Sequence, residues 1–164
     1  MRNPKAHLCT KYYCMKPLIV LIAVFLITSL VLRIMGKAPD YHLAARIAMA
    51  VMLVFTAIGH FAFTAGMSAM IPDIFPQKTA LVYLTGLLEI IFAIGLLLPV
   101  YRTQVAWILI AFLILVLPAN IKASLEHINY QTGEPNGNGP AYLWFRIPLQ
   151  IFFVLWVSLS ALRA

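Results

Sequence analysis

Long runs of apolar residues, interrupted by short polar connections, fill most of this 164-residue chain. Each run approaches the ~20 residues that an α-helix needs to cross a hydrocarbon core of about 30 Å. The runs lack the alternation of apolar and polar residues that a membrane β-barrel requires, so helices must satisfy the backbone in lipid. The pattern predicts an all-α, polytopic membrane helix bundle with five spanning helices, at about 17–35, 43–63, 79–99, 104–121 and 143–162.

The first apolar run follows a basic leader at residues 1–16, an order that secretory signal peptides share. The run is longer than the roughly 7–15 apolar residues of a signal peptide, and the sequence RIMGKAPD after it has no clear A-x-A cleavage site. We therefore expect a retained helix. No linker is long enough to separate domains, so residues 17–164 are expected to form a single transmembrane domain.

Five crossings place the polar connections at two ends of the bundle. We call side A the end that holds the N-terminus and the connections at 65–78 and 122–142. Side B holds the 33–42 connection, the short VYRT turn and the C-terminus. Side A carries seven Lys and Arg residues and side B five. Because cytoplasmic connections are enriched in these residues, the count predicts, by a small margin, that side A lies in the cytoplasm.

Composition excludes an ordinary soluble domain. Hydrophobic residues make up 63% of the chain and charged residues 10%, against roughly half and a quarter in soluble proteins. The net charge of +7 does not indicate nucleic acid, because the basic residues lie at the ends of the apolar runs, where they meet lipid headgroups. The lipid bilayer is the expected partner. Cys9 and Cys14 have a C-x4-C spacing that favours free thiols over a disulfide or a metal pair.

Polar residues within or near the ends of the predicted spanning helices form the candidate site. They are His60, Glu89, Asn120, Arg146 and Gln150. Ionisable groups in spanning helices cost at least about 2.5 to 3.5 kcal/mol and usually face a bundle interior or a wet cavity. All five residues belong to the half of the bundle nearest side A, and Glu89 is the deepest. We expect one cluster in which Arg146 is the counter-ion of Glu89 and His60 is its titrating neighbour.

Two interpretations of this cluster stay open at this point. It could lock the helices together, since buried polar pairs in membranes contribute about 1 kcal/mol each, or it could form a ligand or proton site. No catalytic residue is assigned and no metal site is expected, although His60 with Glu89 could ligate a metal and His60 could be an axial haem ligand. Arg46 lies near side B, where we expect it to reach the interface in a structural role.

Small residues and prolines add expectations about packing. Gly86 and Gly95 let neighbouring helices approach closely, so we expect the 79–99 helix at the centre of the bundle. Pro72 and Pro76 predict a short, stiff connection between the second and third helices.

The connection LEHINYQTGEPNGNGPAY is rich in Asn, Gly and Pro, which predicts a surface loop at side A. It could be a plain connector or a lid over a site. Three tryptophans, Trp107, Trp144 and Trp156, are expected to anchor the helices at the membrane interfaces or to pack within the bundle.

Five stretches of the sequence form a recognisable pattern: AIGHFAF, IPDIFP, LTGLLEIIFAIGLLLPVYR, LPANIKASL and WFRIPLQ. Together they resemble the DoxX-like family of small bacterial integral membrane proteins. The resemblance covers about residues 44–162, and it implies a four-helix core to which the first helix is an addition. It also implies motif positions at His60, Glu89, Pro99, Arg102, Asn120, Arg146 and Gln150.

The same resemblance suggests functions. It implies a bacterial inner (cytoplasmic) membrane location and links to thiosulfate and quinone-linked redox systems, oxidative-stress complexes or methylamine utilisation. It would also place both ends of the four-helix core in the cytoplasm and side A outside, opposite to the charge count. We expect an accessory or structural subunit of a larger redox or respiratory complex, with other membrane subunits as partners. The alternatives are an oxidoreductase component that handles a quinone or a sulfur compound, and a small-molecule or proton carrier, which the absence of an internal repeat disfavours.

Overall fold

The computed structural model describes residues 4–36, 40–137 and 139–163, with the side chains of residues 4–14 and 141 outside the described part. The expectation for the thiols of Cys9 and Cys14 falls on those side chains. The described residues contain no strand. The helices long and apolar enough to cross a membrane are Met15–Ile34, Tyr41–Ala62, Lys78–Leu97, Arg102–Leu125 and Leu143–Leu162. The predicted all-α class and its five spans are confirmed.

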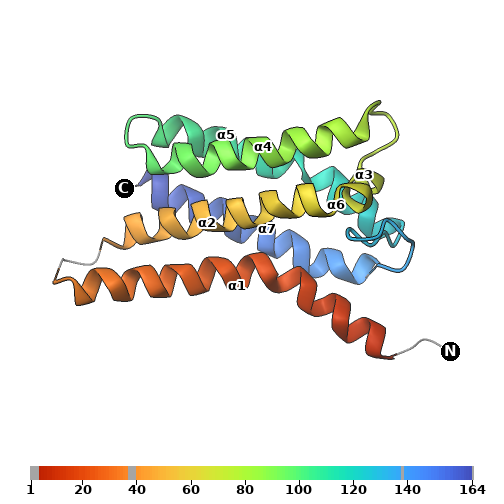
Figure 1. The fold of residues 1–164 in the computed structure, drawn as a ribbon, viewed down its shortest axis with the longest axis horizontal. Helices are drawn as coiled ribbons and strands as arrows, with labels where there is room; N and C mark the ends of the chain where they lie inside the picture. Colours follow the sequence, from red (N-terminus) through yellow and green to blue (C-terminus); the bar gives the residue numbers. More distant parts are fainter. Residues whose placement is uncertain (1–3, 37–39, 138, 164) are drawn as a thin grey trace.

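The helices lie side by side along the long axis of the molecule (Figure 1). In chain order the elements are α1 (Pro4–Ile34), α2 (Tyr41–Ala62), α3 (Thr64–Met70), α4 (Lys78–Leu97), α5 (Arg102–Leu115), α6 (Leu117–Leu125), the 3-10 turn η1 (Pro140–Tyr142), α7 (Leu143–Val157) and the π-helical turn η2 (Ser158–Leu162). One end holds α3, α6 and the loop before α7, and the other holds the end of α1, the start of α2 and the α4–α5 turn. These ends correspond to sides A and B.

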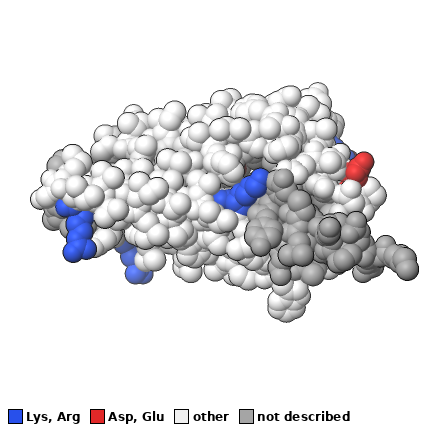
Figure 2. All heavy atoms as spheres, turned by 60° about the horizontal axis from the view of Figure 1, so that its bottom comes forward, with Lys and Arg blue, Asp and Glu red and all other residues white. Residues whose placement is uncertain are grey.

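Helix α1 lies on the outside of the bundle and packs against α2. It begins at Pro4, so the expected boundary at Pro17 is not the start of a helix. A proline inside a spanning helix bends it without ending it, and Figure 1 shows α1 bent. Among its described side chains Leu21 alone is fully buried, whereas Leu26 and Leu30 are exposed. In Figure 2 most of the described surface between the two ends of this side is uncharged, with one basic group near its middle.

Helix α2, and not α4, is at the centre of the bundle. It contacts α1, α3, α4, α7 and η2, whereas α4 contacts mainly α2, α3 and α5. The small residues of α4 are points of close approach to two neighbours: Gly86 packs on His60 of α2, and Gly95 packs on Val105 of α5. The expectation of a central 79–99 helix was wrong because glycines permit contact on one face without requiring burial on all faces.

The fourth span is divided into two helices. Helix α5 ends at Leu115 and α6 begins at Leu117, with Pro118 in the first turn of α6. Proline has no N–H, and its ring crowds the carbonyl four residues earlier, so the hydrogen-bond ladder breaks here. The span then continues to Leu125, beyond its expected end near residue 121. Helix α3 likewise occupies part of the connection that the sequence predicted as a loop, and it ends just before Pro72.

Side B is held together by side chains that bond to backbone carbonyls. Arg46 donates from Nη1 to Ser160 O at 3.3 Å and is only 9% exposed, so it is structural but does not reach out to the interface as expected. Trp156 donates to a carbonyl of α2 and packs inside the bundle. Trp107 and Trp144 are exposed, as interface anchors would be.

Candidate functional site

A cavity of about 500 Å³ lies toward side A between α1, α2, α4, α6 and α7, and the loop before α7 forms one of its walls. Most of the lining side chains are apolar. Polar side chains on its walls include Lys16, His60, Thr85, Glu89, Asn120 and Arg146. The structure therefore brings four of the five predicted site residues to one cavity and leaves Gln150 outside it.

The close approach of α2 and α4 brings His60 to Glu89. A Cβ atom on Gly86 would lie 2.9 Å from His60 Cβ, so only a glycine allows this packing. Glu89 follows Gly86 by three residues and therefore shares its helix face. His60 Nε2 lies 3.6 Å from Glu89 Oε1, and the side chains of His60 and Glu89 are 18% and 11% exposed. The pair is thus a buried feature of the cavity wall.

Thr85 determines where the protons of this pair can be. Its Oγ1 lies 2.9 Å from Val82 O and 3.1 Å from His60 Nδ1. The hydroxyl group of Thr85 has a single proton. If Thr85 donates it to Val82 O, His60 Nδ1–H donates to Thr85. If Thr85 donates it to His60 Nδ1, the ring proton is on Nε2, which faces Glu89. Glu89 Oε2 is buried and has no hydrogen-bond partner, and a bare carboxylate in that position is costly.

The shorter of the two distances, to Val82 O, favours the first arrangement, with the proton of Thr85 on that carbonyl. His60 Nδ1–H then donates to Thr85, and one further proton between Nε2 and Glu89 Oε1, which lie 3.6 Å apart, would relieve the repulsion of two facing lone pairs. With this shared proton, on the imidazole or on the carboxyl group, the pair carries no net charge.

Arg146 is not the partner of Glu89. The described ion pairs include His60 with Glu89 and none between Arg146 and an acidic side chain. Arg146 lines the cavity, and its Nε is buried without a hydrogen-bond partner. The expectation was wrong because the close contact of α2 with α4 at Gly86 brings His60, and not Arg146, next to Glu89. The cavity therefore has a cation that no described carboxylate neutralises.

The two amide side chains of the predicted cluster bond to carbonyls near the break between α5 and α6. Asn120 donates from Nδ2 to Val116 O at 3.0 Å while remaining on the cavity wall. Gln150 is buried and donates from Nε2 to Leu113 O, joining α7 to α5. Polar side chains commonly satisfy carbonyls near a proline break in membrane helices. Gln150 thus joins helices and has no place on the cavity wall.

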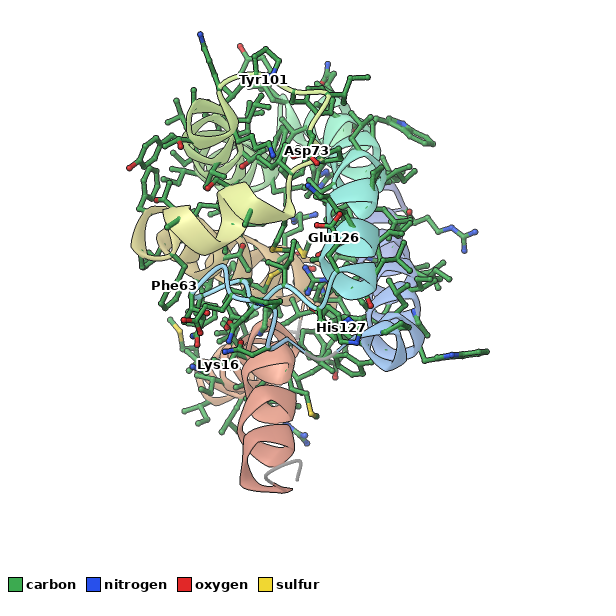
Figure 3. The ribbon with its side chains drawn as sticks, turned by 90° about the vertical axis from the view of Figure 1, so that its right-hand side faces the viewer. Lys16, Phe63, Asp73, Tyr101, Glu126 and His127 are labelled. Carbon is green, nitrogen blue, oxygen red and sulfur yellow. The ribbon has the colours of Figure 1, made fainter. Side chains whose placement is uncertain are left out.

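The loop between α6 and α7 covers the cavity. Its residues Asn129, Tyr130 and Gly139 are among those lining the wall. Figure 3 looks onto side A and shows this loop crossing the end of the bundle near Lys16 and Phe63. The loop is anchored at both ends of its path.

One anchor is a hydrogen bond from Ser124 Oγ to Gly139 O at 2.6 Å. The other is the packing of Tyr130 on Phe63 and over Gly66, where an added Cβ would lie 2.1 Å from Tyr130 O. Asn129 also bonds within the loop, accepting from Gln131 N at 3.0 Å. The geometry is that of an ordered cover, and whether it opens as a lid stays a prediction.

An ion cluster braces the same end from outside the cavity. Asp73 lies between Lys78 and Lys122, and Lys122 also donates to Ile71 O at 3.0 Å (Figure 3). The hydrogen bond from Lys78, followed by that from Lys122, lowers the pKa of the Asp73 carboxyl. These contacts tie the α3–α4 connection to α6.

The sequence did not single out several of the residues that line the cavity. Lys16 comes from α1, Met67 and Met70 from α3, and Tyr130 and Tyr142 from the loop and η1. None of them carries a motif, and α3 was itself unexpected. The aromatic residues flanking the polar loop were the one available signal, since tyrosines in a glycine- and proline-rich connection suggest packing on a surface.

The arrangement places groups suited to proton exchange and to anion binding on one cavity wall. His60 and Glu89 provide the shared proton, and Arg146 provides a permanent charge. Among the described side chains no group of three or more His, Cys, Asp or Glu residues could hold a metal ion, so the pair has no third ligand of these types.

Comparison with known families gives one assignment. Residues 49–161 match a family described as a domain of unknown function (DUF8561), over more than half of the chain. The chain belongs to this family. The DUF8561 match runs from α2 to η2, so it includes every predicted site residue and excludes α1. No curated protein and no solved structure matches the chain. The resemblance to DoxX-like proteins stays a prediction.

Proposed function

We propose that this DUF8561 member binds a small amphiphilic molecule within the membrane, in the cavity at side A. The observation that carries the proposal is an apolar-walled cavity of about 500 Å³ with a buried His60–Glu89 pair on its wall. Ligand sites typically occupy roughly 300–1,000 Å³ and combine apolar walls with a few placed polar groups. The apolar walls would hold the body of the molecule, and the polar groups would orient its head.

The unpartnered polar atoms favour a binding role over a purely structural one. Glu89 Oε2 and Arg146 Nε are buried without partners. A network that served only to hold helices would be expected to satisfy its own members, because unpaired buried groups cost about 1–3 kcal/mol each. A bound head group would supply the missing partners. The His60–Glu89 pair would then share its proton with that group.

A redox role is a narrower form of this proposal. If the predicted relationship to DoxX-like proteins holds, a quinone or a sulfur compound in a bacterial inner membrane would be the molecule to try first. A quinone carbonyl could accept the proton that His60 and Glu89 share. The carrier alternative requires the same binding step together with access from both sides.

An accessory subunit is the second candidate, and it was the first expectation from the sequence. The observation that favours it is α1, which lies outside the core helices and leaves apolar side chains such as Leu26, Leu30 and Ile34 exposed. Another membrane subunit could pack there, although lipid satisfies the same surface. Partners would then be membrane proteins rather than nucleic acid.

One experiment tests both candidates. The protein is purified from its own membrane in mild detergent, and co-purifying small molecules and polypeptides are measured by mass spectrometry. Ala119 lines the cavity and Ala111 is exposed on α5, so Ala119→Phe fills the cavity and Ala111→Phe is the matched control. Cavity binding predicts a small molecule retained by the wild type and by Ala111→Phe and lost from Ala119→Phe.

Equal retention in all three proteins, or no retained molecule, would overturn the cavity proposal. A stoichiometric polypeptide that remains with all three proteins would instead support the accessory subunit. Absence of any such polypeptide would count against it.

A further inference from the structure

We propose, on the basis of the proposed function, that the cavity selects an anionic amphiphile: a carboxylate or phosphate head on an apolar tail. The head would be bound by Arg146, beside the His60–Glu89 pair. The tail would lie along the apolar wall. The charge of the cavity, the state of Arg146 and the shape of the wall each support this choice.

The cavity wall carries a positive excess. Its described lining residues include the basic side chains of Lys16 and Arg146 and a single acidic one, Glu89. Glu89 lies beside His60, and the pair is neutral when it shares one proton. Arg146 is partly buried, its Nε has no hydrogen-bond partner, and it forms no ion pair with a described acidic side chain, so a nearby anion would offset the cost of its desolvation. A neutral or cationic ligand would not have this effect.

Arg146 is suited to an anionic head in particular. Its guanidinium is always charged and presents a planar set of donors that matches carboxylate and phosphate oxygens. Its Nε is buried with no partner, and the residue lies on the cavity wall. Glu89 would repel an anion only if it lost the shared proton.

The wall also indicates a tail. Phe55 and Ile58 line the cavity, and Ile58 is 60% exposed although it lies in the spanning part of α2. Ile58 therefore belongs both to the cavity wall and to the outer surface of α2. Val82 and Val116 continue the apolar surface on α4 and at the α5–α6 break. A tail could therefore enter from the hydrocarbon region, while the head stays with the polar groups.

The test is direct binding to the full chain in nanodiscs of zwitterionic phosphatidylcholine. Radiolabelled dodecanoate is the probe, with dodecanol as the uncharged match and acetate and inorganic phosphate as anions without tails. Dodecanoate is expected to bind at least tenfold more tightly than dodecanol and far more tightly than acetate or phosphate. The variants are Arg146→Gln, Arg146→Lys and, as the matched control at side B, the exposed Arg163→Gln.

Arg146→Gln should weaken dodecanoate binding at least tenfold and leave dodecanol unchanged. Arg146→Lys should restore part of the loss, and Arg163→Gln should bind as the wild type does. Unchanged dodecanol binding also shows that each variant has kept its cavity.

Other outcomes overturn the inference in distinguishable ways. Equal binding of dodecanol and dodecanoate, both lost in Ala119→Phe, would exclude the anionic head and leave the proposed cavity function standing. Acetate or phosphate binding as tightly as dodecanoate would exclude the tail. Absence of binding by all four probes would exclude this ligand class, and the retained-molecule experiment above would then decide whether the cavity binds anything.

Discussion

Replacement of Gly86 by alanine tests whether the contact between α2 and α4 builds the site. The added Cβ would lie 2.9 Å from His60 Cβ, and Phe61 ring atoms lie 3.4 Å away. The first distance is roughly 0.6 Å or more below the ~3.5–4.0 Å of an optimal carbon–carbon contact. His60 Cβ is fixed to the backbone of α2, so no side-chain rotation relieves the overlap. The two helices must move apart.

The energetic consequence has two opposing terms. Overpacking of a well-packed core costs about 1–3 kcal/mol, whereas alanine in a helix interior is up to about 1 kcal/mol better than glycine. Gly86→Ala should therefore lower the stability by about 0–2 kcal/mol. The same shift would lengthen the 3.6 Å contact between His60 and Glu89 and weaken any binding that depends on their shared proton.

Gly59→Ala provides the matched control. Gly59 is also a helix-interior glycine near the cavity, but a Cβ there meets only Met67 Cε, at an ordinary 3.6 Å. It should therefore gain up to about 1 kcal/mol from helix propensity. Thermal unfolding of both variants in detergent should show Gly86→Ala less stable than Gly59→Ala by about 1–3 kcal/mol, or by several degrees at about 2–4 °C per kcal/mol. A Gly86→Ala protein as stable as Gly59→Ala would refute close helix contact at this position.

Three further changes probe the pair, the loop and the ion cluster. Glu89→Gln should keep the melting temperature within about 3 °C of the wild type, a stability change of roughly 1 kcal/mol, because the amide can donate to His60 Nε2; a purely structural pair predicts a larger loss. Gly66→Ala would place a Cβ 2.1 Å from Tyr130 O, so the loop should lift and be cut faster in limited proteolysis, while the helical circular dichroism stays the same. The pKa of Asp73 is lowered in the folded protein, so its ion pairs stabilise the fold above the ordinary pKa of 3.8 and lose this effect as the pH falls through the lower folded value. Asp73→Asn should therefore make the melting temperature less dependent on pH in this acidic range.

Each of these expectations has a contrary result. A large loss of stability in Glu89→Gln would mean that the His60–Glu89 pair serves mainly to hold α2 and α4 together. Unchanged proteolysis of Gly66→Ala would mean that the loop does not rest on α3. An unaltered acid profile in Asp73→Asn, compared at low and high salt, would show that the exposed ion cluster contributes nothing measurable.

Much of the candidate site could be anticipated from single residues. His60, Glu89, Asn120 and Arg146 stand out because polar groups are costly in apolar helices, and all four line the cavity. Their partners could not be anticipated. Whether Glu89 meets His60 or Arg146 depends on which helices touch and how closely.

The contact of Gln150 could not be predicted from the sequence either. Its spacing from Arg146 places both on one helix face, but that face is wide enough for Arg146 to line the cavity and Gln150 to reach Leu113 O. The carbonyl it bonds lies near a break that Pro118 causes in a different helix. A residue's role here depends on a neighbour that its own sequence context does not reveal.

The sequence by itself determined the all-α class and the number of spans, because the thickness of a bilayer sets the length of apolar run that crosses it. It also determined which connections share an end, since each crossing reverses the side. Only the tertiary structure decided that α2 is central, that the α6–α7 loop covers a cavity, and that His60 pairs with Glu89. These depend on close packing between helices far apart in sequence, where one missing methyl group, at Gly86, decides which side chains meet.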